Sequence, residues 1–129
     1  EASFSKDPSS KFGAVLVDQR GLRRASGFNG FARGFEDTHV RWHDREFKYR
    51  HVIHAEENAL LQANEDLTGY TMYVSGFPCS SCMSKIAQKD IKKVIVYEPS
   101  SDYLSRWSID ESMQVAIECG VEVNVVRRG

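Results

Sequence analysis

Cysteine is scarce in this sequence, with three residues in 129, and no run of apolar residues is long enough to span a membrane. Three cysteines exclude a fully paired disulfide framework. Two of them, Cys79 and Cys82, form a C-x-x-C pair, which is typical of a metal site in a reducing compartment. We therefore expect a cytoplasmic protein that binds no membrane. We expect the third cysteine, Cys119, to be a small buried residue.

An excess of charge of one sign is lacking as well. The net charge is −1 and the pI is about 6.5. Nucleic-acid-binding domains usually carry a basic surface, so this balance argues against nucleic acid as a partner. A small nucleotide remains compatible with it, because one phosphate needs only one or two cationic or N–H partners.

Internal repeats, low-complexity segments and linkers are also missing from the 129 residues. A chain of this length suits one domain with one core, so we expect residues 1–129 to form a single domain. The first residues, Glu1 to Phe4, look like the tail of a helix that starts earlier. We therefore expect that an N-terminal helix is truncated.

The pattern of apolar residues divides the chain into strands and helices. Strands are predicted at 12–17, 22–29, 70–74, 93–97 and 121–125. Helices are predicted at 52–64, at 79–89 after the Pro78 turn, and at 110–119 before Gly120. Residues 30–50 are expected to form a long ordered loop that can include a short helix. This order predicts an α/β fold with a mixed sheet and helices on its faces.

Two short motifs, His54-Ala55-Glu56 and Pro78-Cys79-Ser80-Ser81-Cys82, carry the chemistry. A catalytic zinc site needs three protein ligands and one open position, and His54, Cys79 and Cys82 can supply the three. Both motifs fall where a predicted strand leads into a helix. The positive end of a helix dipole lowers the pKa of a cysteine there. The pattern resembles the signature of the zinc-dependent nucleobase deaminases.

Glu56 is placed to move protons without being a ligand. Zinc brings the pKa of a bound water toward neutrality. Glu56 would take the water proton and deliver protons to a ring nitrogen and a leaving amine. Backbone N–H groups near Ala55 and Cys79 would orient the base or the tetrahedral intermediate. The reaction expected from this arrangement is hydrolytic loss of ammonia from C4 of a cytosine.

A structural zinc site is the alternative, and it needs four ligands. The further candidates are His39, His43 and His51, and none has an obvious partner spacing. His51 and His54 would form H-x-x-H, but Glu56 would then have no role. We expect Glu57, next to Glu56, to be a solvated charge on the helix surface.

Longer segments resemble the deoxycytidylate (dCMP) deaminase family, within the cytidine deaminase superfamily. The similarity covers residues 5–14, 27–34, 44–49, 54–59, 72–74, 77–79 and 91–95. It implies a three-layer α-β-α cytidine-deaminase-like fold with a five-stranded mixed sheet. It also implies zinc-dependent hydrolysis of dCMP to dUMP and ammonia in deoxynucleotide biosynthesis. The alternatives are a deaminase of another cytosine nucleoside, nucleotide or polynucleotide, and a catalytically silent zinc scaffold that binds a nucleotide.

The resemblance also implies substrate contacts. Asn29 would hydrogen-bond the sugar, although an Asn before Gly30 is also common in tight turns. The other candidates are Ala55 near the base, Arg33 and Lys48 for the 5′-phosphate, and Tyr103 in the nucleotide pocket. Trp42 and Trp107 are expected in the core or at a subunit interface, and Phe77 in the core or the pocket.

Family members differ in assembly and in metal content. Many are hexamers that dCTP activates and dTTP inhibits, so the resemblance implies a homo-oligomer with dCTP and dTTP as candidate effectors. Some members carry a second, structural zinc, which we do not expect in this chain. The sequence departs from the family pattern at Phe12 and Ala32, where the family usually has Val and Pro. These changes bear on pocket fit and on loop rigidity.

Overall fold

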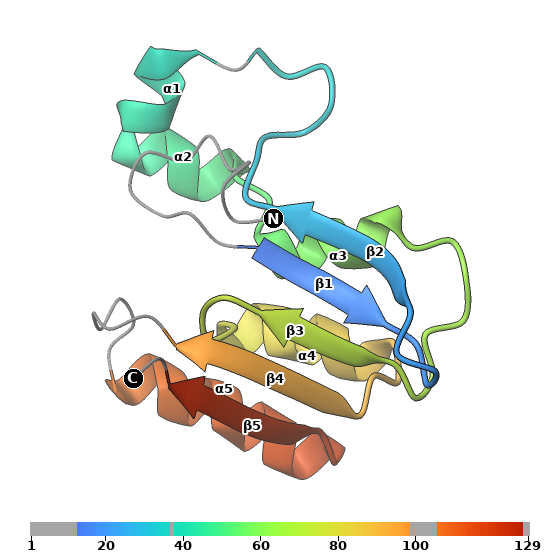
Figure 1. The fold of residues 1–129 in the computed structure, drawn as a ribbon. Coiled ribbons are helices and arrows are strands. Elements are labelled where there is room, and N and C mark those ends of the chain that lie inside the picture. Colours follow the sequence, from blue (N-terminus) through green and yellow to red (C-terminus); the bar gives the residue numbers. More distant parts are fainter. Residues whose placement is uncertain (1–12, 37, 99–105, 128–129) are drawn as a thin grey trace.

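One mixed sheet organises the computed structural model, which describes residues 13–36, 38–98 and 106–127 (Figure 1). Its strands are β1 (Gly13–Val17), β2 (Arg23–Phe28), β3 (Thr71–Val74), β4 (Lys93–Glu98) and β5 (Glu122–Arg127). They lie in the order β2-β1-β3-β4-β5. β1 is antiparallel to both of its neighbours, and β3, β4 and β5 are parallel. The predicted α/β fold with a five-stranded mixed sheet is confirmed.

Helices α3 (Ala55–Gln62), α4 (Ser80–Gln88) and α5 (Arg106–Cys119) each precede one of the last three strands. All three lie against the same face of the sheet (Figure 1). α3 begins three residues later than predicted, because Val52 and His54 have extended backbone and end the preceding segment. None of the described helices is long and apolar enough to cross a lipid bilayer.

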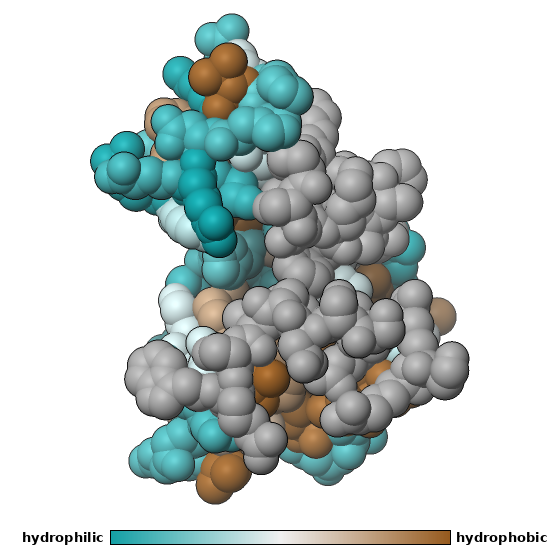
Figure 2. Space-filling model, turned by 90° about the vertical axis from the view of Figure 1, so that its left-hand side faces the viewer, coloured by the Kyte–Doolittle hydropathy of each residue, from teal (hydrophilic) through white to brown (hydrophobic). Residues whose placement is uncertain are grey.

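The predicted loop at 30–50 contains two short helices, α1 (His39–His43) and α2 (Arg45–His51). A side chain caps each N-terminus. Thr38 Oγ1 accepts a hydrogen bond from the N–H of Arg41 at 3.2 Å in α1. Asp44 Oδ1 accepts one from the N–H of Phe47 at 3.1 Å in α2. The two helices project beyond the end of β2, away from the sheet (Figure 1). Figure 2 views the molecule from the left-hand side of Figure 1, and the surface over α1 and α2 is mainly hydrophilic in that view.

The core fills the space between the sheet and helices α3 to α5. Alternate strand residues point to this side, and Leu16, Met72 and Val94 are completely buried. Met83 and Ile86 of α4 belong to the same buried cluster. The sheet therefore buries one continuous apolar face under these helices.

The end of α5 corrects one prediction. Gly120 has φ +74°, and the N–H of Val121 donates to the carbonyl of Ala116 at 2.8 Å, which closes the helix as expected. Ala116 is buried, but Cys119 is exposed. The prediction of a buried Cys119 is wrong, because this residue lies on the closing turn, where the neighbouring Gly120 is exposed too.

Gly27 lets α3 lie directly on β2. A Cβ atom at this position would be 2.5 Å from the backbone nitrogen of Ala59 and 2.7 Å from the carbonyl oxygen of Ala55. Both are backbone atoms of α3, so a side-chain rotation cannot relieve the overlap. The missing side chain thus sets the distance between β2 and the first turn of α3.

We predict that Gly27→Ala lowers the free energy of unfolding by about 1–3 kcal/mol, because the added methyl group must push α3 away from the strand. Gly30→Ala is the matched control, since a Cβ at Gly30 meets nothing within 4 Å. Urea denaturation of both variants measures the difference. Equal midpoints for the two would show that this close approach does not constrain the packing.

Candidate metal centre

Two helix starts meet at one edge of the sheet. β2 and β3 are both antiparallel to β1 and therefore run in the same direction. α3 and α4 begin near the ends of these strands (Figure 1). His54 is the N-cap of α3 and Cys79 is the N-cap of α4. This edge, at the carboxyl ends of parallel strands, is where α/β proteins commonly place their ligands.

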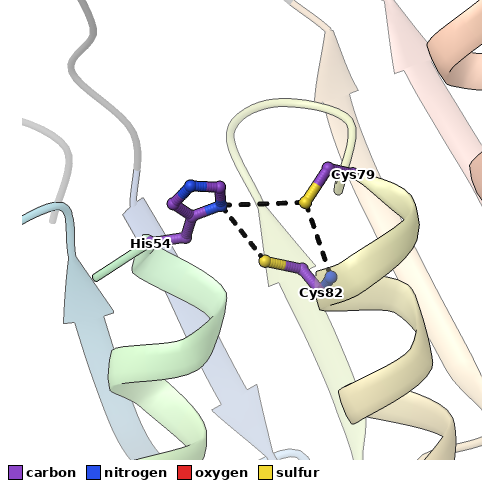
Figure 3. Close-up of side chains that lie close together, drawn as sticks. All are labelled: His54, Cys79 and Cys82. Atoms are coloured by element: carbon purple, nitrogen blue, oxygen red, sulfur yellow. Dashed lines mark hydrogen bonds between the residues drawn. The ribbon is translucent and has the colours of Figure 1, made fainter. Parts of the chain in front are cut away.

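The three predicted metal ligands converge there (Figure 3). His54 Nδ1 lies 3.8 Å from Cys79 Sγ and 3.3 Å from Cys82 Sγ. All three ligand atoms lie within 4.8 Å of one another. Tetrahedral zinc with its usual bond lengths to nitrogen and sulfur separates such atoms by about 3.5 Å. The donor types and spacing therefore fit zinc.

A fourth ligand is not part of this group. Among the described residues, no further His, Cys, Asp or Glu side chain joins the three. His51 lies instead beside Phe35 and Phe47, with ring centroids 5.2 and 4.4 Å away. His39 and His43 lie against each other in α1, with their ring centroids 3.8 Å apart. The three-ligand arrangement favours a catalytic site over the structural alternative.

Hydrogen bonds within the His-Cys-Cys group favour a thiolate at Cys79 before any metal binds. A hydrogen bond from the Cys82 thiol, with a further one from His54, lowers the pKa of Cys79 to about 4. The same contact with Cys79, together with burial, raises the pKa of Cys82 far above its ordinary value. The hydrogen bond to Cys79 raises the pKa of His54. Binding of a metal ion must therefore displace the proton on Cys82.

Glu56 lies in the first turn of α3 and is buried, with 8% of its surface exposed. Burial raises the pKa of its carboxyl group to about 7. A pKa near the working pH suits a group that both accepts and donates a proton. A bound cation would act in the opposite direction and favour the carboxylate. Among the described residues, Glu56 is the one acidic residue that is buried as a whole.

Asn29 and Gly30 attach the end of β2 to the start of α3. Asn29 is buried, and its Oδ1 accepts from the N–H of Ala55 at 3.0 Å. Gly30 and Ile53 exchange two backbone hydrogen bonds of 3.1 and 2.7 Å. The Ala55 N–H, expected to orient the base or the intermediate, is thus already bound to Asn29. This contact places Asn29 next to Ala55, the residue between His54 and Glu56 in the sequence.

The candidate phosphate and pocket residues fall in different surroundings. Arg33 is exposed in the segment between β2 and α1. Lys48 is buried in α2, with its Nζ 5.5 Å from the centroid of the Tyr49 ring. Tyr103 lies outside the described residues, as do Phe12 and the side chain of Trp107. Phosphate binding by Arg33 and Lys48 and pocket lining by Tyr103 stay predictions.

Trp42 and Phe77 are placed more clearly. Trp42 is buried in α1 and stacks on Phe31, with ring centroids 4.3 Å apart. Phe77 is 6% exposed and belongs to the apolar core. The sequence left open a core position or a subunit interface for Trp42, and a core position or the pocket for Phe77. Both residues are buried, which fits the core position.

Glu57 was expected to be a solvated charge, and the structure corrects this. Its Oε1 accepts from the N–H of His54 at 3.0 Å, and its Oε2 lies 2.7 Å from Lys85 Nζ. Lys85 was not singled out from the sequence. A carboxylate three residues after an N-cap is a known capping arrangement, but the contact with Lys85 spans 28 residues of sequence and has no local signal.

Several known proteins are similar to this chain. Residues 1–98 match the family described as the cytidine and deoxycytidylate deaminase zinc-binding region. An uncharacterized deaminase from the luxG 3′ region of Aliivibrio fischeri is 43% identical over 123 residues, covering 94% of this chain and 82% of the relative. Human deoxycytidylate deaminase is 39% identical over 100 residues, covering 73% of this chain and 56% of the human enzyme.

A solved structure agrees over almost the whole chain. The dCMP deaminase of cyanophage S-TIM5, crystallised in complex with dCMP and dUMP, has a TM-score of 0.76 at 28% identity. The match covers 97% of this chain and 88% of the phage chain. The expected cytidine-deaminase-like fold is thereby confirmed.

The fold and the His-Cys-Cys group are those of the zinc-binding deaminase class. More specifically, the chain belongs to the cytidine and deoxycytidylate deaminase family. It spans about half the length of the primate, mouse and nematode deoxycytidylate deaminases that it matches.

We predict that removing zinc lowers the melting temperature, since a ligand that binds only the folded state at 1,000 times its Kd adds about 4 kcal/mol of stability.

Zinc affinity should fall as pH falls, because the Cys82 thiol must lose its proton for zinc to bind. Cys82→Ser should abolish most of the zinc-dependent shift. Cys119→Ser, at an exposed cysteine outside the ligand group, is the control and should keep it.

Thermal melts with and without a chelator, at several pH values, measure both effects. A zinc-dependent shift that persists in Cys82→Ser, or an affinity that rises as pH falls, would contradict this ligand assignment.

Proposed function

We propose that the protein catalyses the hydrolytic deamination of dCMP to dUMP and ammonia. The observation that carries this proposal is the buried Glu56, two residues after His54, beside a three-ligand site at the meeting of two helix starts. Support comes from relatives named deoxycytidylate deaminase and from the phage structure with dCMP and dUMP bound. The metal ligands in this proposal are His54, Cys79 and Cys82.

A bound zinc ion supplies Lewis acidity and lowers the pKa of water to near neutrality. Glu56 accepts a proton from the water that attacks C4 of the cytosine. It passes that proton to the ring nitrogen N3, so a C–O bond forms without a build-up of charge. Glu56 then carries the second water proton to the exocyclic amine, the C–N bond breaks, and ammonia leaves. The net reaction consumes one water, and the carboxylate is regenerated.

The surroundings of Glu56 suit this role. Burial keeps the carboxyl group away from bulk water and raises its pKa to about 7, which allows both proton uptake and release near neutral pH. Asn29 holds the first turn of α3 through the Ala55 N–H. We place the sugar of the substrate near Asn29 and the base near Ala55. The 5′-phosphate contacts proposed for Arg33 and Lys48, and the pocket contact of Tyr103, complete the site.

We predict that Glu56→Gln keeps zinc but lowers kcat by at least about 100-fold, because the amide cannot accept and return a proton. Glu118→Gln, an exposed substitution on α5, is the matched control and should leave kcat unchanged. Zinc content by metal analysis and ammonia release on dCMP are measured together. If Glu56→Gln turned over dCMP at the normal rate, Glu56 would not be the proton carrier.

The substrate is tested by a panel of dCMP, CMP, dCTP, deoxycytidine and 5-substituted dCMP, assayed with zinc-loaded protein. The proposal expects the highest kcat/KM on dCMP. Preference for a nucleoside would move the assignment to another cytosine substrate. Activity only on an oligonucleotide would support a polynucleotide deaminase, which the net charge of −1 disfavours. Nucleotide binding without any ammonia release would indicate a silent scaffold.

Location and assembly are also proposed. A cytoplasmic location suits a site that needs two reduced cysteines. A homo-oligomer, with a hexamer as the first expectation, and control by dCTP and dTTP follow from the family resemblance. Light scattering gives the assembly, and addition of dCTP or dTTP to the dCMP assay tests the effectors.

A further inference from the structure

Lys85 and Glu57 connect the two helices that carry the metal ligands. Lys85 lies on α4, three residues after Cys82, and its Nζ is 2.7 Å from Glu57 Oε2. The same ammonium group donates to Ser81 Oγ at 3.0 Å. The other carboxylate oxygen, Glu57 Oε1, accepts from the backbone N–H of His54 at 3.0 Å. A continuous chain of polar contacts thus leads from the helix with both thiols to the backbone of the imidazole ligand.

This chain of contacts matters because the ligands come from separate helices. Cys79 and Cys82 share the first turn of α4, so their spacing is set by one helix. His54 is fixed to α3, and its distance from the thiols depends on how the two helix starts are held. Asn29 attaches α3 to the sheet through Ala55, whereas the contact between Glu57 and Lys85 attaches α3 to α4 itself.

The two side chains differ in exposure. The side chain of Glu57 is 24% exposed and that of Lys85 is 49% exposed. Burial raises the pKa of Glu57, but the hydrogen bonds from Lys85 and from the His54 N–H outweigh it and lower the pKa below its ordinary value. The hydrogen bond with Glu57 raises the pKa of Lys85. The pair is therefore charged at neutral pH.

We propose that Glu57 and Lys85 are positioning residues of the metal centre, which hold the starts of α3 and α4 at the separation that zinc requires. Neither residue belongs to the group of candidate metal ligands. Polar partners of metal ligands commonly change metal affinity by about 10–100-fold when they are removed. The inference rests on the zinc ligands of the proposed function, but it does not depend on the substrate.

The test compares Lys85→Met with Lys93→Met. The first keeps the apolar stem of Lys85 and removes the ammonium group. The second does the same to Lys93, whose Nζ lies 3.9 Å from Glu122 Oε2 between β4 and β5, where it serves as the matched control. Zinc affinity is measured by competition with a chromophoric chelator. The thiolate and d–d absorption bands of the cobalt-substituted protein report the geometry at the metal.

We expect Lys85→Met to weaken zinc binding by about 10-fold and to shift the cobalt bands, while Lys93→Met changes neither. Lys85→Arg, which keeps the charge, should restore most of the affinity. Glu57→Gln should weaken binding in the wild-type background and add little in Lys85→Met, because the two residues act as one unit.

Equal zinc affinity and equal cobalt spectra for Lys85→Met and the wild type would overturn the proposal. So would additive effects of Glu57→Gln and Lys85→Met. Thermal melts of the metal-free variants separate positioning from folding, since a loss of stability without any change in the cobalt bands would assign the pair a structural role only. These measurements use no substrate. A negative result for Glu57 and Lys85 is therefore distinguishable from a lack of activity on dCMP.

Discussion

The shared direction of β2 and β3 is the constraint on which the metal centre depends. Because β1 lies between them and is antiparallel to both, these two strands end at the same edge of the sheet. α3 follows β2 after the short helices α1 and α2, whereas α4 follows β3 directly. Both α3 and α4 cover the same face, so two helix N-termini meet there (Figure 1). Gly27 then lets α3 approach β2 closely enough for Asn29 to bind the Ala55 N–H. The ligand distances follow from these contacts.

The electrostatics of the site follow from the same geometry. N-terminal helix dipoles favour thiolates, and the three donors lie close enough to share protons before any metal binds. One thiolate forms at Cys79 at the expense of Cys82, which retains its proton. A bound metal cation would replace the proton on Cys82, so that both cysteines are thiolates. Glu56 is buried next to the same helix start, and the raised pKa of its carboxyl group suits the proton transfer that we propose for it.

Stability and function meet at the start of α3. The segment before this helix is paired with Gly30, its first N–H with Asn29, and its N-cap N–H with Glu57. Two residues that follow β2 and one residue of α3 itself therefore hold the start of this helix. Such support costs conformational freedom, and it is typical of sites whose side chains must be held in one geometry. Helices α1 and α2, by contrast, stand beyond the sheet (Figure 1), and the ring of Phe31 contacts both Trp42 of α1 and Phe47 of α2.

The sequence by itself indicated the three candidate ligands, the acidic residue beside them and the five strands, because short motifs and apolar periodicity are local signals. His54, Cys79 and Cys82 were predicted from spacing, and the structure brings them together. Only the tertiary structure decided the two short helices, the exposure of Cys119 and the role of Glu57. Short helices depend on caps and neighbours rather than on periodicity, and the contact of Glu57 with Lys85 joins residues distant in sequence. The physical reason is that long-range contacts leave no local pattern, whereas metal ligands at helix starts do.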